Sequence, residues 1–179
     1  MPALFLDRDG VINVRTVGDY VKSPAEFVPV EGLGEAMRLL AGLFERIVVV
    51  TNQAGIGRGR MAESDLIAVH TKMIDIVQAA GGRIDKAYYC PHRSDAGCDC
   101  RKPAPGMAHK AKTDFPDIDF KDAWLIGDSA SDIEFGQRLG MHTALITGKT
   151  EETEILNNME VDIRCGSLLE FVKIFNSRK

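Results

Sequence analysis

Short apolar runs alternate with longer amphipathic stretches along most of the chain. The apolar runs are rich in Val, Ile and Leu, as in strands that are buried on both faces. They predict strands at 3–7, 46–52, 86–90, 123–128, 142–147 and 161–165. The stretches between them repeat apolar residues at helical spacing, and they predict helices at 32–44, 63–81, 105–115, 131–140 and 167–175. This alternation favours an α/β fold, a doubly wound (Rossmann-like) parallel sheet with helices on both faces.

The length of 179 residues suits one domain spanning 1–179, and no predicted stretch is long enough for a separate cap domain. The net charge of −4 argues against a nucleic-acid partner, which usually needs a basic face. No apolar run approaches the roughly 20 residues of a membrane span. The first residues, MPALFLDRDG, do not read as a secretory signal. We therefore expect a cytoplasmic protein without a membrane partner, and a monomer as the default state.

Polar residues gather where three of the predicted strands end. Asp7, Thr51 and Asp128 each follow or close an apolar run. In an open parallel sheet, ligands bind outside the carboxyl ends of the strands. The three side chains therefore predict a binding site at one edge of the sheet.

The most informative stretch is FLDRDGVIN, in which Asp7 and Asp9 are followed by Gly10. One interpretation is an ordinary turn, because Asp and Gly are common after strands. The other is a carboxylate nucleophile with an acid–base partner two residues along, both facing one pocket because Gly10 lets the chain turn. Like charges would keep these carboxylates away from a phosphate, and a magnesium ion relieves that repulsion.

Further residues fit a phosphate site, although each also has an ordinary interpretation. Asp128 is the expected metal ligand, and Asp132 either caps a helix or orients the loop. Thr51 offers a hydroxyl group to a phosphoryl oxygen, and Lys102 offers a positive charge. Taken alone, a lysine before a proline is usually just solvated.

As a set and in this order, the motifs Asp-x-Asp-Gly, Thr-Asn, Lys-Pro and Gly-Asp-x-x-x-Asp resemble the haloacid dehalogenase superfamily of phosphatases. The resemblance spans residues 5–132. It implies that Asp7 attacks phosphorus to form an aspartyl phosphate, and that Asp9 protonates the leaving alcohol and then activates water. It implies Mg²⁺ on Asp7, the Asp9 carbonyl and Asp128, with Thr51 and Lys102 stabilising the transferring group.

Three of the four cysteines lie in one short segment, CPHRSDAGCDC, at 90–100. Cys90, His92, Cys98 and Cys100 match the ligand set of a tetrahedral structural Zn²⁺ site. The segment leads directly into Arg101 and Lys102, so the metal would fix one wall of the site. Cys165 stands apart and is expected to be a small buried residue.

The zinc segment narrows the resemblance to two branches of the family, the D-glycero-D-manno-heptose 1,7-bisphosphate 7-phosphatases and the histidinol-phosphate phosphatases. The stretches DRDGVINV, YVKSPAEFVPVEG and TNQAGIGRG look most like the first branch. The short segment between His92 and Cys98 resembles the second, and Ser129 replaces a lysine often found in the first. The resemblance implies a small phosphorylated sugar as substrate, contacted by Asp19, Tyr20, Asn52, Gln53, Ala54, Arg101 and Ser129.

Three alternatives stay open at this stage. One is a histidinol-phosphate or less selective sugar phosphatase with the same catalytic set. Another is a receiver-like domain that accepts phosphate on an aspartate without turning it over. The third is a zinc-stapled binding module with a vestigial pocket. Asp9 argues against the receiver, because an acid–base group would hydrolyse the acyl phosphate.

Overall fold

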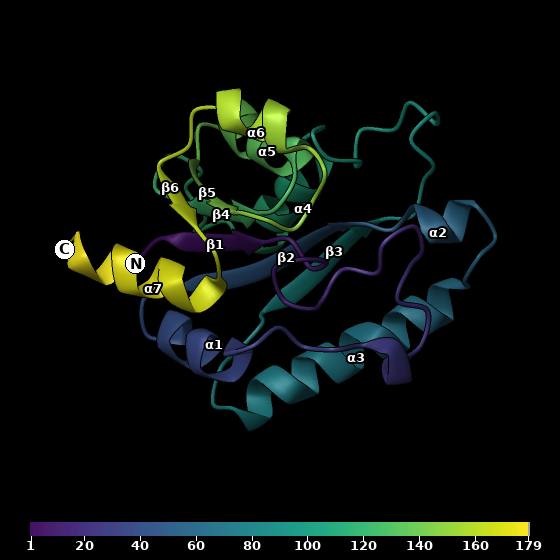
Figure 1. Cartoon of the computed structure of the whole chain (residues 1–179), viewed down its shortest axis with the longest axis horizontal. Helices are drawn as coiled ribbons and strands as arrows, with labels where there is room; N and C mark the ends of the chain where they lie inside the picture. The colour runs from purple at the N-terminus through teal and green to yellow at the C-terminus, as the bar shows by residue number, and fades with distance from the viewer. Residues whose placement is uncertain (179) are drawn as a thin grey trace.

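A six-stranded parallel sheet forms the centre of the computed structural model, which describes residues 1–178 (Figure 1). The strands lie in the order β3-β2-β1-β4-β5-β6, and this confirms the predicted doubly wound fold. Their bounds are β1 Ala3–Leu6, β2 Arg46–Asn52, β3 Lys86–Cys90, β4 Trp124–Gly127, β5 His142–Ile146 and β6 Ile163–Cys165.

Helices cover both faces of this sheet, as Figure 1 shows. On one face α1, α3 and α7 pack together, and α4, α5 and α6 lie on the other. The helix bounds are η1 Pro24–Glu26, α1 Leu33–Ala41, α2 Ala54–Gly57, α3 Glu63–Ala79, α4 Gly106–Asp114, α5 Ala130–Leu139, α6 Thr153–Asn158 and α7 Leu168–Ser177. No helix in residues 1–178 combines the length and apolarity that crossing a bilayer requires.

The unbroken apolar run of β1 follows from its place in the middle of the sheet. Leu4 and Leu6 point into the core under α1, α3 and α7, whereas Ala3 and Phe5 point into the core under α4 and α5. All four side chains are buried. Because both faces are covered, the strand shows no alternation of apolar and polar residues.

Three short helical segments, η1, α2 and α6, were not predicted from the sequence. The segment α2 contains two glycines, which disfavour helices, so its sequence reads as a loop. Packing explains one of them, because a Cβ atom on Gly57 would lie 2.7 Å from the carbonyl oxygen of Pro91. The glycine thus lets α2 lie directly against the start of the cysteine-rich segment.

Strand register brings the polar strand ends together. Leu6 pairs with Val49 on one side and with Ile126 on the other. Asp7 therefore leaves the sheet between β2 and β4, and its backbone N–H still bonds to the carbonyl of Ile126 at 2.9 Å. Thr51 and Asp128 lie at the ends of these two neighbouring strands. The predicted site edge is thus present in the fold.

Candidate active site

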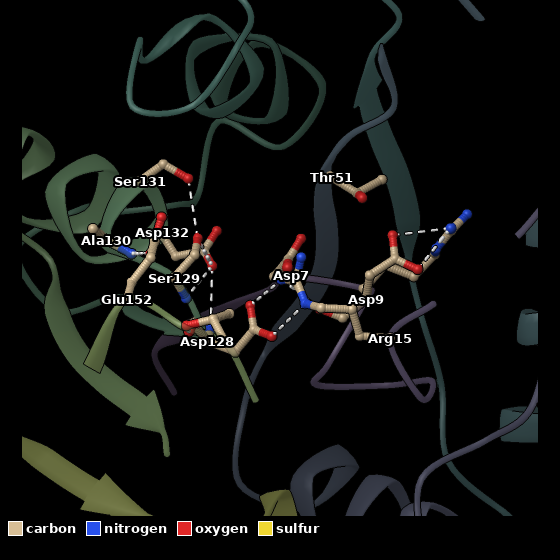
Figure 2. A network of polar contacts seen from close by, with 12 residues as sticks. Asp7, Asp9, Arg15, Thr51, Asp128, Ser129, Ala130, Ser131, Asp132 and Glu152 are labelled. Carbon is tan, nitrogen blue, oxygen red and sulfur yellow. Dashed lines mark hydrogen bonds and ion pairs between the residues drawn. The ribbon is translucent and has the colours of Figure 1, made fainter. Parts of the chain in front are cut away.

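A cavity of about 270 Å³ opens at the carboxyl edge of the sheet. Four residues of the expected catalytic set line it, namely Asp7, Asp9, Thr51 and Lys102. Figure 2 shows Asp7 and Asp9, which follow β1, and Asp128, which follows β4, converging on this place. The geometry therefore gathers side chains that are distant in the sequence, such as Asp7 and Lys102, which are 95 positions apart and in contact.

Lys102 is the cation at the bottom of the cavity. Its Nζ donates to Asp7 Oδ1 at 2.7 Å, to the Val50 carbonyl at 2.7 Å and to Asp132 Oδ1. Burial alone would lower the pKa of Lys102, but the carboxylates of Asp132 and Asp7 raise it. Lys102 therefore stays positively charged beside Asp7, which is not the solvated role that is usual for a lysine before a proline.

Asp7 has little solvent around it. Burial, followed by the nearby Asp132 carboxylate, raises its pKa to about 7, although Lys102 acts in the other direction. An ionised Asp7 is thus costly in this site unless further positive charge arrives. A divalent cation next to Asp7 would supply that charge.

Asp9 is clamped by donors from three other residues. Arg8 Nη2 lies 2.9 Å from both carboxylate oxygens, and Asn13 Nδ2 and Gln53 Nε2 each donate at 2.9 Å. Burial alone would raise the pKa of Asp9, but Arg8 and these hydrogen bonds lower it. The side chain is therefore held as a carboxylate facing the cavity.

Asp132 orients the loop that carries Asp128. Its Oδ2 accepts hydrogen bonds from the backbone N–H groups of Asp128 and Ser129 and from the Ser129 hydroxyl. Its Oδ1 accepts from Lys102. The residue is fully buried, and both oxygens are engaged. This geometry favours the loop-orienting interpretation of Asp132.

Asp128 lies beside the turn at Gly10 and beneath Arg15. Gly10 has φ +93°, and a Cβ atom there would lie 1.9 Å from Asp128 Oδ2. Glycine is thus required both for the turn and for the close approach of the two loops. Arg15 Nε lies 3.0 Å from Asp128 Oδ2, and Arg15 Nη2 lies 2.6 Å from Asp128 Oδ1.

The surroundings of Asp128 fit a divalent cation. A carboxylate oxygen of Asp7 lies within 4.8 Å of a carboxylate oxygen of Asp128. Arg15 Nη2 lies between Asp128 Oδ1 and the Asp9 carbonyl, 3.2 Å from the latter, so these oxygens already surround a positive group. Carboxylate and carbonyl oxygens are the ligands that Mg²⁺ prefers. The donor set therefore matches the expected metal site.

The expected substrate contacts divide between two neighbouring cavities. Tyr20, Asn52, Ala54, Arg101 and Ser129 line the catalytic cavity. Asp19 lines an adjoining cavity of about 680 Å³, where it pairs with Lys22 and Arg60. Tyr20 and Ser129 line both. A substrate with two charged ends thus has room to extend from one cavity into the other.

Gln53 requires a correction. It was expected to contact substrate, but it is fully buried, and its amide donates to Asp9 Oδ2 and to Thr51 Oγ1, each at 2.9 Å. Its side chain therefore supports Asp9 and Thr51 from behind.

The amide of Asn52 is also engaged with the protein. It accepts from the Lys102 backbone N–H at 2.9 Å and donates to the Lys102 carbonyl at 3.1 Å. Asn52 thus fixes the backbone that carries Lys102. Its contact with a substrate remains a prediction.

The cysteine-rich segment folds into a compact set of ligand atoms. Atoms from Cys90, His92, Cys98 and Cys100 all lie within 4.8 Å of one another. Cys90 Sγ lies 3.6 Å from Cys98 Sγ, and His92 Nδ1 lies 3.2 Å from Cys100 Sγ. Tetrahedral Zn²⁺ with Zn–S bonds of about 2.3 Å separates its ligands by about 3.5–3.8 Å. Cys90 Sγ and Cys100 Sγ lie 3.0 Å apart, so small outward shifts of the side chains would let the residues fit zinc. All four cysteines are free.

Two arginines of the site were missed in the sequence. Arg8 is fully buried, and the sequence offered one signal, a charged residue enclosed between two aspartates after a buried strand. Arg15 lies in a polar stretch and reaches a residue 113 positions away. No local pattern could have indicated that contact.

Comparison with known proteins agrees with this geometry. Residues 99–170 match the family model described as HAD-hydrolase-like. The chain is 40% identical to the D-glycero-beta-D-manno-heptose-1,7-bisphosphate 7-phosphatase of Pseudomonas putida over 154 residues, which cover 86% of this chain and 87% of the relative. It is 39% identical to the D-glycero-alpha-D-manno-heptose-1,7-bisphosphate 7-phosphatase of Mycobacterium bovis, with coverage of 76% and 72%.

A solved structure supports the same assignment. The D,D-heptose 1,7-bisphosphate phosphatase from B. bronchiseptica, complexed with magnesium and phosphate, matches with a TM-score of 0.89 at 32% identity over 100% of both chains. The chain therefore belongs to the haloacid dehalogenase-like family of hydrolases, in the branch of the heptose-1,7-bisphosphate 7-phosphatases.

Proposed function

We propose that this phosphoric monoester hydrolase removes the 7-phosphate of D-glycero-D-manno-heptose 1,7-bisphosphate through an aspartyl phosphate on Asp7. The observation that carries the proposal is the contact of Asp7 with a buried Lys102 in a cavity that Asp9 also lines. Relatives named for this activity support the choice of substrate.

In the first half of the proposed reaction, a carboxylate oxygen of Asp7 attacks phosphorus, and the bond to the sugar oxygen breaks. Lys102 offsets the negative charge of Asp7, so a phosphate can approach it. Thr51 Oγ accepts from Gln53, which leaves its own hydrogen to donate to a phosphoryl oxygen. The sugar oxygen leaves with a proton taken from Asp9.

In the second half, a water molecule attacks the phosphorus of the aspartyl phosphate, and Asp9 accepts the proton that it loses. Phosphate leaves, and Asp7 is restored. The hydrogen bonds from Arg8, Asn13 and Gln53 hold Asp9 in the ionised form that this step requires. For the first half Asp9 must be protonated, and the negative charge of an arriving phosphate favours that form by raising its pKa.

The proposal includes Mg²⁺ held by Asp7, the Asp9 carbonyl and Asp128. When bound, the ion supplies positive charge to the phosphoryl oxygens and to Asp7. The protein prepares the place through Asp132, which fixes the Asp128 backbone, and through Gly10, which allows the close approach.

It also includes Zn²⁺ held by Cys90, His92, Cys98 and Cys100, with a structural role. Arg101 follows this segment directly and lines the catalytic cavity, and its Nη1 has no hydrogen-bond partner among the described residues. A guanidinium with an unpaired nitrogen suits a second phosphate group. We therefore assign Arg101 to substrate recognition.

A panel of substrates tests the proposal. Purified protein is assayed for phosphate release with Mg²⁺ on the α and β anomers of heptose 1,7-bisphosphate, on heptose 7-phosphate and on histidinol phosphate. We expect the highest kcat/KM on a bisphosphate, with loss of turnover when Mg²⁺ is chelated. A preference for histidinol phosphate would overturn the substrate assignment.

A rapid-quench experiment with ³²P-labelled substrate tests the chemistry separately. We expect an acid-stable labelled adduct that accumulates in Asp9→Asn and is absent in Asp7→Asn. Failure to trap label in any variant that still turns over would contradict the covalent route.

A further inference from the structure

Arg15 covers the carboxylate that is expected to bind the metal ion. Its Nε and Nη2 engage both oxygens of Asp128, and Nη2 also donates to the Asp9 carbonyl. Figure 2 shows the Arg15 side chain lying between Asp9 and Asp128. Asp128 has no exposed surface, whereas 35% of the Arg15 side chain is exposed. Solvent and ions therefore reach Asp128 only if Arg15 moves.

The contacts of Arg15 use the same atoms as the proposed metal site. Mg²⁺ binds oxygen ligands at about 2.0–2.1 Å in near-octahedral geometry. Arg15 Nη2 lies 2.6 Å from Asp128 Oδ1 and on the same side as the Asp9 carbonyl. A cation on these two oxygens and the guanidinium of Arg15 cannot both be in place.

Arg15 is also the main tether of its loop. Thr16, Val17 and Gly18 make no hydrogen bond with other described residues, and Val17 is 86% exposed. The loop is held before this stretch by the bond from Val14 to Val28 and after it by the pairing of Asp19 with Lys22. Release of Arg15 would therefore free the backbone of residues 15–18.

We propose that Arg15 and the divalent cation compete for Asp128 and the Asp9 carbonyl, so that binding of the ion expels Arg15 and loosens residues 15–18. This inference rests on the metal site of the proposed function. Arg15 lines both the catalytic cavity and the adjoining one. Once displaced, its positive charge stays in the wall that an anionic substrate faces.

The competition predicts how much Arg15 weakens the apparent affinity for Mg²⁺. If the covered form is favoured about tenfold over the open form, the apparent affinity for the ion is weakened about tenfold. Removing the guanidinium removes this weakening. If Arg15 instead helped to hold the ion, its removal would weaken Mg²⁺ binding. If Arg15 had only a structural role, its removal would leave the affinity for Mg²⁺ unchanged.

Isothermal titration calorimetry of the 179-residue protein with Mg²⁺ tests this directly. We compare wild type with Arg15→Ala and Arg15→Gln, which also shows whether loss of the side chain alone impairs folding. Arg60→Ala is the matched control, because Arg60 lines the adjoining cavity but pairs with Asp19 and not with Asp128. We expect Kd for Mg²⁺ to fall about tenfold in both Arg15 variants, and a fall below about threefold would overturn the proposal.

Backbone ¹⁵N relaxation supplies a second readout that does not depend on catalysis. In wild type, saturating Mg²⁺ should lower the heteronuclear NOE of the amides in residues 15–18, and in Arg15→Ala these values should be low with or without the ion. Unchanged or higher values in wild type would overturn the proposal. Asp128→Asn distinguishes failure of the proposed metal site from failure of the competition by Arg15. If wild type binds Mg²⁺ no better than Asp128→Asn, Asp128 is not a ligand and the proposed metal site is wrong.

Discussion

The ammonium group of Lys102 lies 2.7 Å from Oδ1 of Asp7, and both side chains are almost completely buried. The same ammonium group contacts Asp132, so one cation pairs with two carboxylates, one directly after β1 and one in α5. Lys102 thus offsets the charge of Asp7, the proposed nucleophile, and also joins the segments that carry Asp7, Val50 and Asp132.

Replacing Lys102 by Met should destabilise the protein and abolish turnover. The substitution leaves two buried carboxylates without their partner, which typically costs about 3–5 kcal/mol. Urea unfolding and phosphate release measure the two effects. The double variant Lys102→Met/Asp132→Asn should regain part of the stability but none of the activity. A double variant no more stable than Lys102→Met would show that Asp132 is not the partner that matters.

Replacing Asn52 by Ala should move Lys102 through its backbone. The amide of Asn52 makes two hydrogen bonds to Lys102, one to the N–H and one to the carbonyl. We expect a loss of about 1–3 kcal/mol in unfolding free energy, because buried groups lose their partners. We expect kcat to fall by a larger factor than the factor by which KM rises. Asn158→Ala removes only an exposed bond to Glu154 and should change neither quantity.

Replacing Cys98 by Ser should release zinc and loosen the segment 90–100. Binding of a structural metal and local folding are coupled, so one lost thiolate weakens both. Metal analysis of protein purified without chelators, together with limited proteolysis, measures the outcome. Cys165→Ser is the control, because Cys165 lies outside the cluster. Wild type containing no zinc would contradict the assignment.

Stability should fall as pH decreases, in part because of His70. Burial lowers the pKa of His70 from 6.5 to about 3. Between these values the unfolded chain binds a proton that the folded protein resists, so the contribution is present above about pH 6.5 and is lost as pH falls toward about 3. At pH 5 the loss is about 2 kcal/mol.

Urea unfolding at pH 7 and pH 5 isolates this contribution when wild type is compared with His70→Gln. The variant should lose less stability on acidification than wild type does. His109→Gln replaces an exposed histidine and should keep the wild-type difference. Equal losses in wild type and His70→Gln would mean that His70 is protonated in the folded protein.

The sequence was sufficient for the sheet and for residues placed by strand ends. Asp7, Thr51 and Asp128 follow apolar runs, and a parallel sheet brings such positions together whatever the loops do. The cysteine-rich segment could be interpreted for a similar reason, since its ligands lie close in the chain. In both cases a local pattern fixes the place of the side chain.

Contacts made by long polar side chains could not be predicted in this way. Gln53 follows a strand like a pocket residue, yet it turns inward to Asp9 because that carboxylate needs donors. Arg15 comes from a stretch with no periodic pattern and finds Asp128 across the fold. Such pairings depend on the packed arrangement of loops.

The position of β1 in the middle of the sheet also bears on how the protein is made. Asp7 and Asp9 follow β1, but the neighbouring strand β4 and its loop are synthesised more than a hundred residues later. A nascent chain that ends before residue 128 therefore lacks both Asp128 and Asp132, and we expect it to be inert. Truncated products of interrupted translation would accordingly be unable to consume the substrate.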